Sequence, residues 1–147
     1  MTRISLVIAA LLLSACQEPP QLGASDAWVR LPPVKGRPGA GYMTITGGEA
    51  PARLISISSP VATRTEMHDT VRADGMMQMR AMDGLDVPAN ATIAFAPGGR
   101  HAMLFNINPG IKPGSRVPLV LTFADGRRIT VSAAAQAAGD PPPTKED

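Results

Sequence analysis

The sequence predicts an all-β domain, built as a two-sheet Greek-key sandwich of about eight or nine strands. The chain has 15 prolines and 14 glycines in 147 residues and few signals for helix, which favours strands and turns. Short runs in which apolar and polar residues alternate are separated by turn residues, as expected for half-buried strands. A hydrophobic fraction of 44% is enough for one domain with a core.

The first residues predict an export signal. A positively charged start precedes residues 4–13, an apolar segment too short to span a bilayer. Residues 13–16, Leu-Ser-Ala-Cys, resemble the lipobox of bacterial lipoproteins, where cleavage precedes a cysteine that then carries lipid. We therefore expect a signal peptide over residues 1–15, lipidation of Cys16, a tether over residues 16–25 and a membrane-anchored, periplasmic protein. The alternative is an ordinary signal peptide with an incidental cysteine.

Charge and composition exclude several classes of function. The net charge of +2 comes from scattered Lys and Arg without a basic run, and one Trp, one Tyr and three Phe are few for stacking on bases. Nucleic acid is therefore not an expected partner. The serines form no nucleophile elbow and no triad pattern, so we do not expect an enzyme. Cys16 is the only cysteine, which leaves the mature domain without a disulfide or a thiolate ligand.

The folded domain is expected over residues 26–134. The alternating or apolar runs that predict its strands are residues 27–30, 41–46, 54–58, 63–71, 92–95, 101–105, 116–124 and 127–132. Residues 135–147 are rich in Ala and then Pro, which predicts a disordered tail.

Individual positions in these strands can be assigned to a face. Trp28 is expected in the core, because large aromatic side chains are usually buried. In the run 54–58 the strand period of two places Ile55 and Ile57 on one apolar face, opposite the serines between and after them. The sandwich core is therefore expected to include both isoleucines.

Asp74-Gly75 predicts a tight hairpin, because a type I′ turn needs positive φ at both central residues. With these two residues in the turn, Thr70 lies opposite Met79. His68 is then diagonal to Met79 on the same face, at roughly 7–8 Å between Cα atoms. The hairpin thus brings an imidazole and a thioether together.

Two histidines and two methionines are candidate metal ligands. His68 and His101 are the only histidines in the chain, and Met103 shares a face with His101 because residues two apart in a strand point the same way. Neutral imidazole nitrogen and soft thioether sulfur, with Met79 as the fourth ligand, suit Cu(I) better than Mg, Ca or Mn. Zinc would want more His, Cys or carboxylate, and a blue-copper site needs a Cys thiolate.

The remaining methionines near this hairpin have a simpler interpretation. Met67, Met77 and Met82 are expected to fill packing space, as methionine commonly does. Met77 shares the face of Met79, so it is also the best candidate for a secondary metal ligand. Met76, next to the turn, is expected to be exposed.

The spacing of the four candidate ligands, His68-x10-Met79-x21-His101-x-Met103, matches the copper-binding motif of the PCu(A)C family of periplasmic copper chaperones. The chain resembles this family well beyond the motif. The similar stretches are residues 26–30, 42–45, 66–68, 77–80, 97–99, 103–104 and 119–126. Arg100 departs from the family pattern, which usually has an aromatic or aliphatic residue before the second ligand histidine.

The resemblance implies a cupredoxin-like β-sandwich that binds one Cu(I) through His68, Met79, His101 and Met103 and passes it on. The implied recipient is the copper-A subunit of cytochrome c oxidase, reached directly or through a thioredoxin-like copper assembly protein. Two alternatives remain open at this point: a periplasmic lipoprotein that scavenges or stores copper, and a structural lipoprotein whose site has decayed. The ligand residues alone do not separate delivery from storage.

Overall fold

The structure, a computed structural model, describes residues 18–144. Every regular element in this part of the chain is a β-strand, so the all-β prediction is confirmed. Within residues 18–144 there is also no helix with the length and apolar character needed to cross a membrane. The expected signal peptide (1–15) and the lipidation site Cys16 lie outside the described residues.

Ten strands follow one another within residues 18–144, against the eight or nine expected. They are β1 (Gly23–Arg30), β2 (Gly39–Thr46), β3 (Ala52–Ser58), β4 (Arg64–Ala73), β5 (Met76–Ala81), β6 (Leu85–Val87), β7 (Thr92–Phe95), β8 (His101–Phe105), β9 (Arg116–Phe123) and β10 (Arg128–Gln136). The strand without a counterpart in the sequence analysis is β6, which is only 3 residues long and carries no alternating pattern.

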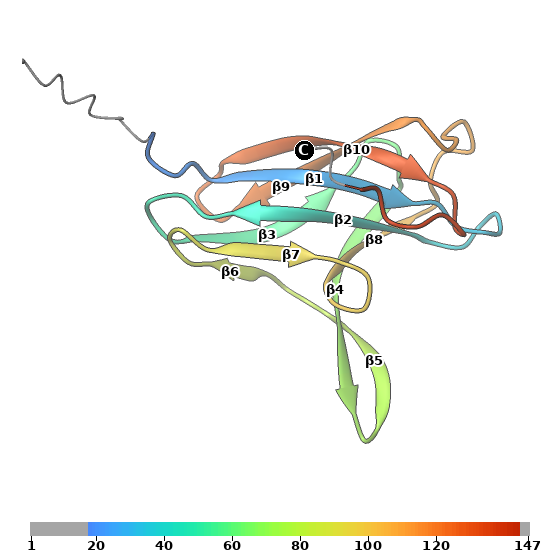
Figure 1. The fold of residues 1–147 in the computed structure, drawn as a ribbon, viewed down its shortest axis with the longest axis horizontal. Coiled ribbons are helices and arrows are strands. Elements are labelled where there is room, and N and C mark those ends of the chain that lie inside the picture. Colours follow the sequence, from blue (N-terminus) through green and yellow to red (C-terminus); the bar gives the residue numbers. More distant parts are fainter. Residues whose placement is uncertain (1–17, 145–147) are drawn as a thin grey trace, which may run out of the picture.

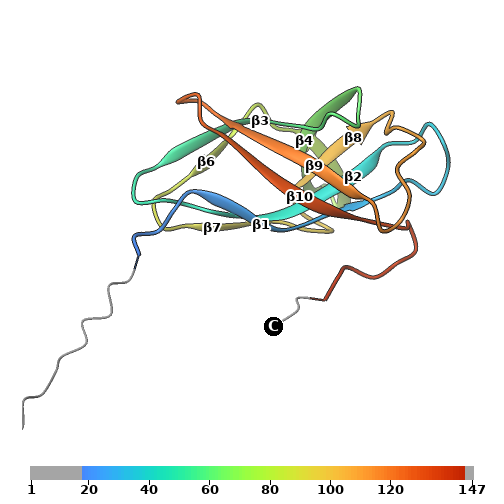
Figure 2. The same cartoon turned by 90° about the horizontal axis from the view of Figure 1, so that it is seen from above.

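The ten strands form one hydrogen-bonded sheet that folds over on itself. The order is β5-β4-β8-β2-β1-β10-β9-β3-β6, and β7 pairs with β2 beside this path. Figure 2 shows the resulting two layers, with β3 and β9 above β1 and β7. Most neighbours are antiparallel, whereas β1 and β10 run parallel and connect the two halves. The fold is thus a sandwich made from a single continuous sheet.

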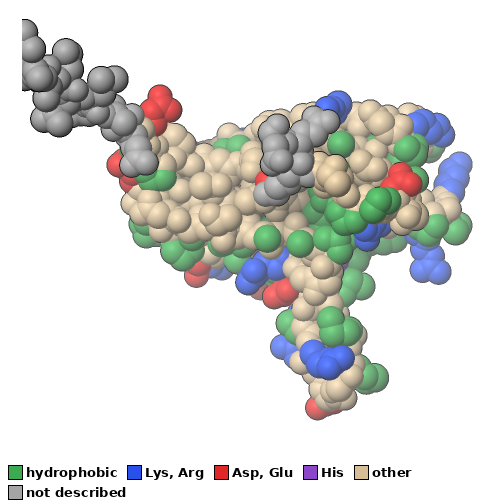
Figure 3. All heavy atoms as spheres, viewed as in Figure 1, with side chains coloured by type: hydrophobic (Ala, Val, Ile, Leu, Met, Phe, Trp, Pro, Cys, Tyr) green, Lys and Arg blue, Asp and Glu red, His purple; other side chains and the backbone are tan. Residues whose placement is uncertain are grey.

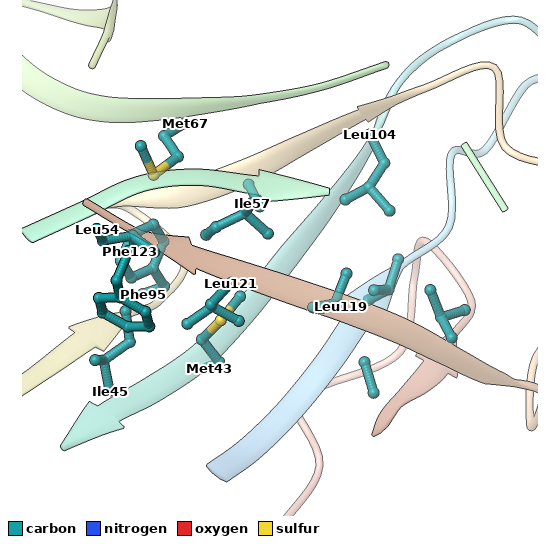
Figure 4. Packing of buried hydrophobic residues seen from close by; sticks show 14 of the residues in the cluster. Met43, Ile45, Leu54, Ile57, Met67, Phe95, Leu104, Leu119, Leu121 and Phe123 are labelled. Carbon is teal, nitrogen blue, oxygen red and sulfur yellow. The ribbon is translucent and has the colours of Figure 1, made fainter. Parts of the chain in front are cut away.

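The core lies between these layers and is built by strand alternation. In β9, Val117, Leu119, Leu121 and Phe123 point inward with at most 1% exposure, while the residues between them are less buried. Figure 4 shows Leu119 and Leu121 facing side chains such as Ile57 and Met43 from other strands. Each such side chain, fully buried, contributes about 1.5–3 kcal/mol to folding.

A β-bulge changes the expected pattern in β3. The pairing of β3 with β9 shifts register between Leu54 and Ser56, so Leu54 and Ile57 face the core at 0% and 2% exposure. Ile55 is 44% exposed, and the expectation that it shares the core face with Ile57 is wrong. The reason is that a bulge inserts one extra residue and resets the period of two.

The strands at both ends of the domain run past the expected limits. β1 begins at Gly23, within the expected tether, and β10 continues to Gln136, so Ala135 does not belong to a disordered tail. Alanine is a weak strand former. Here its backbone pairs on both sides: Ala134 lies opposite Trp28 of β1 and opposite Arg116 of β9. Nonlocal pairing therefore overrides the local preference.

The β4–β5 hairpin has the register expected from its turn. Thr70 lies opposite Met79, and Asp74 and Gly75 have φ of 51° and 75°, as a type I′ turn requires. Figure 1 shows this hairpin projecting from the body of the sandwich. The first candidate ligand, His68, stands at its base.

The bulge gives a matched stability test within one strand. We expect Ile57→Ala to lower the free energy of unfolding by about 2–5 kcal/mol, because it leaves a cavity in the core. Ile55→Ala removes the same atoms from an exposed position and should cost less than ~1 kcal/mol. Urea denaturation of the two variants measures both values. Equal losses would show that Ile55 is buried in solution and that the bulge is misplaced.

Candidate metal centre

Antiparallel pairing of β4 with β8 builds the centre of the candidate site. His68 lies directly opposite His101, and Glu66 lies directly opposite Met103. Since neighbours in a strand alternate between faces, these four side chains share the outer face of the sheet. The intervening residue Met67 faces the core with 4% exposure. The inward-facing residues of β4 and β8 are part of the core, so the core holds the site residues of these two strands in place.

The two imidazoles lie close together and are shielded from solvent. Their ring centroids are 5.7 Å apart and the rings are tilted by 42°. His101 is 7% exposed, and the side chain of His68 is 15% exposed. A pair of imidazoles at this separation can converge on one metal ion after small side-chain rotations.

The two thioethers lie on opposite sides of the histidine pair, Met103 along β8 and Met79 along the hairpin. Met103 is partly buried, two residues after His101 in β8. Met79 lies opposite Thr70, which is two residues farther along the hairpin than His68, and Met79 is 58% exposed. The structure thus places all four predicted ligand residues on one face, with the histidines at the base and Met79 at the solvent side.

Hydrogen bonds fix one nitrogen of each imidazole. His68 Nε2 donates to Glu66 Oε2 at 2.9 Å, and His101 Nδ1 donates to the carbonyl of Gly99 at 3.2 Å. The Nδ1 atom of His68 is buried and has no hydrogen-bond partner among residues 18–144. Glu66 was not among the predicted site residues, although its position two residues before His68 in a strand is the signal that places both on one face.

The other methionines divide between core and surface. Met67 belongs to the core cluster and Met82 packs against it, as expected. Met77 is 57% exposed, so its predicted packing role is wrong, and it lies opposite Arg72, farther out than Met79. Met76 is exposed, as expected. Figure 3 shows hydrophobic side chains on the surface of the projecting hairpin.

An aromatic pair lies beside the histidines on the same outer face. Trp28 is buried with 6% exposure, as expected, although it is not one of the residues of the main core cluster. Its ring lies 4.5 Å from that of Tyr42, and the Arg30 guanidinium lies 5.0 Å from the Trp28 ring. Burial raises the pKa of the Tyr42 hydroxyl, and the charge of Arg30 opposes that rise.

The donor set of this face favours a soft monovalent cation. Residues 18–144 contain no group of three or more His, Cys, Asp or Glu side chains arranged to hold a metal ion. Two imidazoles and two thioethers remain, which together match the preferences of Cu(I).

A family model and two curated proteins match the sequence. The family described as "Putative lipoprotein LpqE-like" matches residues 22–135. "Putative lipoprotein Lxx21020" of Leifsonia xyli subsp. xyli is 31% identical over 114 residues, which cover 74% of this chain and 65% of that protein. "Uncharacterized protein RP573" of Rickettsia prowazekii is 28% identical over 81 residues, 54% of this chain and 45% of that protein. The chain thus spans less than two thirds of the length of either relative.

Solved structures share the fold. The copper-bound PCuAC domain from PmoF2 superposes with a TM-score of 0.64, covers 82% of this chain and 99% of that domain, and is 22% identical. The solution structure of CuI-DR1885 from Deinococcus radiodurans has a TM-score of 0.61 and 29% identity, and covers 84% of this chain and 81% of that one. The sandwich described above is therefore the fold of PCuAC domains.

Proposed function

We propose, from the premise that the chain belongs to the LpqE-like lipoprotein family and has the fold of PCuAC domains, that it is an extracytoplasmic Cu(I)-binding metallochaperone. The observation that carries the proposal is the placement of His68 directly opposite His101, with Met79 and Met103 on the same face. The likeness to CuI-DR1885, a structure named for its Cu(I), supports the same metal.

The proposed ligands are His68, Met79, His101 and Met103. Both imidazoles are largely shielded, which limits competition by water, whereas Met79 is more than half exposed. Copper is the cargo of such a site. An acceptor can approach the exposed thioether first, because it is the ligand that needs the least rearrangement to be displaced. Met77, two residues nearer the turn on the same face, is the proposed alternate ligand during exchange.

The chemistry of the ligands fits delivery outside the cytoplasm. Thiolate ligands there are lost to oxidation, whereas thioethers do not form disulfides. Imidazole and thioether are neutral, so the bound copper keeps its positive charge and is held less tightly than by thiolates. A cysteine-rich acceptor is therefore favoured to receive it. The proposed acceptor is the copper-A subunit of cytochrome c oxidase, reached directly or through a thioredoxin-like copper assembly protein.

The proposed membrane anchor is lipid on Cys16. Two observations support it: the Leu-Ser-Ala-Cys sequence at residues 13–16, and the lipoprotein description of the matching family. The first strand begins at Gly23, so only residues 17–22 separate the lipid from the fold. Fully extended, six residues reach roughly 20 Å. The domain would thus stay close to the membrane that carries its lipid anchor.

Copper binding can be tested by anaerobic competition with a chromogenic Cu(I) chelator. The chain from Gln17 onward should bind one Cu(I). Removing a residue that only supports a metal ligand lowers affinity by about 10–100-fold. The double variant His101→Ala, Met103→Ala removes two ligands, so its affinity for Cu(I) should fall by more than that. Met76→Ala, on the opposite face of the hairpin, is the matched control and should bind as the wild type does. A wild-type chain that cannot compete for Cu(I) contradicts the proposal.

Delivery can be separated from storage by a transfer experiment. The Cu(I)-loaded chain is mixed anaerobically with the metal-free soluble copper-A domain or with a thioredoxin-like copper assembly protein. We expect copper to move to one of these acceptors, because thiolates bind Cu(I) more tightly than thioethers do. The acceptor and the donor are then separated and their copper is measured. Copper that stays on this chain in both mixtures identifies a scavenging or storage protein.

The anchor can be tested by labelling cells with an alkyne fatty acid. The wild-type chain should incorporate the label and sediment with membranes, while Cys16→Ser should do neither, because cysteine is the only acceptor in the motif. Immunoblotting of the membrane and soluble fractions measures both. Equal membrane association of the two forms would refute a lipid anchor at Cys16.

A further inference from the structure

We infer that Glu66 is a positioning residue that holds His68 in the tautomer whose Nδ1 faces copper, while His101 binds the metal through Nε2. This inference rests on the proposed function, since it concerns the same metal site. It adds a residue that the ligand motif does not contain. It also assigns a different nitrogen of the ring to each of the two histidines.

The assignment for His68 follows from its hydrogen bond. Its Nε2 lies 2.9 Å from Glu66 Oε2, and an ionised carboxylate can only accept. The proton of the neutral ring is therefore on Nε2, which leaves the lone pair on Nδ1. That Nδ1 is buried and has no hydrogen-bond partner within residues 18–144. A buried acceptor without a partner is unfavourable in the metal-free chain, and a bound cation would satisfy it.

The same logic gives the other nitrogen for His101. Its Nδ1 lies 3.2 Å from the carbonyl oxygen of Gly99, which can only accept, so Nδ1 carries the proton. The lone pair is then on Nε2. Gly99 is two residues before His101, and its carbonyl also accepts from the backbone N–H of Thr70 in β4. The backbone of the β7–β8 loop therefore orients this imidazole without help from a side chain.

Glu66 is itself held in place by Arg64. The Arg64 Nε donates to Glu66 Oε1 at 3.0 Å, while the guanidinium lies 4.1 Å from the centre of the Phe105 ring. Both carboxylate oxygens are therefore engaged, one by Arg64 and one by His68. Arg64 is largely exposed and Glu66 is partly exposed, so this chain of contacts contributes little to stability. Its consequence is the orientation of the imidazole.

Glu66 is unsuited to bind Cu(I) itself, although it lies opposite Met103 on the same face. Carboxylate oxygen is a hard ligand, whereas Cu(I) prefers sulfur and imidazole. A carboxylate on the far nitrogen of a metal-binding histidine instead fixes the ring and makes the ligand nitrogen more basic. The distances around Glu66 match this supporting arrangement.

The experiment reads the tautomers directly. The chain from Gln17 onward, which contains the ten strands described above, is labelled with ¹⁵N at its two histidines. Long-range ¹H–¹⁵N spectra in mildly alkaline buffer should show the metal-free His68 protonated on Nε2 and His101 protonated on Nδ1. One equivalent of Cu(I), added anaerobically, should then shift His68 Nδ1 and His101 Nε2.

Variants test the role of the carboxylate. Glu66→Ala should leave His68 as a mixture of tautomers and weaken Cu(I) binding by about 10–100-fold, the usual effect of removing such a partner. Glu66→Gln keeps an oxygen acceptor and should restore the tautomer and part of the affinity. Asp69→Ala is the matched control: it removes a carboxylate adjacent to His68, but on the opposite face and opposite Arg80, and should change neither readout.

The outcomes separate this inference from the proposed function. A metal-free His68 protonated on Nδ1, or a copper-dependent shift at His68 Nε2, overturns the nitrogen assignment while copper binding stands. Unchanged affinity and tautomer in Glu66→Ala, or an equal loss in Asp69→Ala, overturns the positioning role. Absence of any copper-dependent shift in the wild-type chain overturns the proposed function and the copper-binding part of this inference with it.

Discussion

The antiparallel pairing of β4 with β8 is the constraint on which the candidate site depends. It sets His68 opposite His101, although 33 positions of sequence numbering separate them, and it sets Glu66 opposite Met103. A shift of one residue in this register would turn the histidines into the core and Met67 out to solvent. Such a shift is opposed by the apolar residues on the other face, because Met67, Ala102 and Leu104 are all buried. The hydrophobic core therefore fixes the geometry of the polar site.

The site combines a buried half on β8 and an exposed half on β5. His101 and Met103 belong to β8, which is paired on both sides and buried in the sandwich. Met79 belongs to β5, an edge strand whose six residues are all exposed, on a hairpin that projects from the body (Figure 1). A strand with few buried contacts opens at low cost in free energy. In this arrangement His101 and Met103 on β8 can capture a metal ion, and the ion can leave past the exposed thioether of Met79.

Short-range sequence features account for the part of the site whose geometry was predicted correctly, which is the position of His68 relative to Met79. The Asp74-Gly75 turn sets the hairpin register, and so the diagonal relation of His68 to Met79 follows from four residues of turn chemistry. The bulge in β3 that exposes Ile55 carries no comparable signal, because it is defined only by the pairing of β3 with the distant strand β9. The same holds for the tilted pair of Trp28 and Tyr42, which is brought together by the pairing of β1 with β2 and is buried beside the main core cluster.

The sequence by itself determined the all-β class, the family resemblance that the comparisons confirm, and which face of each strand carries the candidate ligands. These depend on period-two alternation and on turns, whose physics acts over a few residues. Only the tertiary structure decided that β10 extends through Ala135 by pairing with β1, and that Glu66 and Gly99 each hold one nitrogen of a histidine. Such contacts depend on side-chain rotamers and on the pairing of strands that are distant in the sequence. Neither can be predicted from a few neighbouring residues.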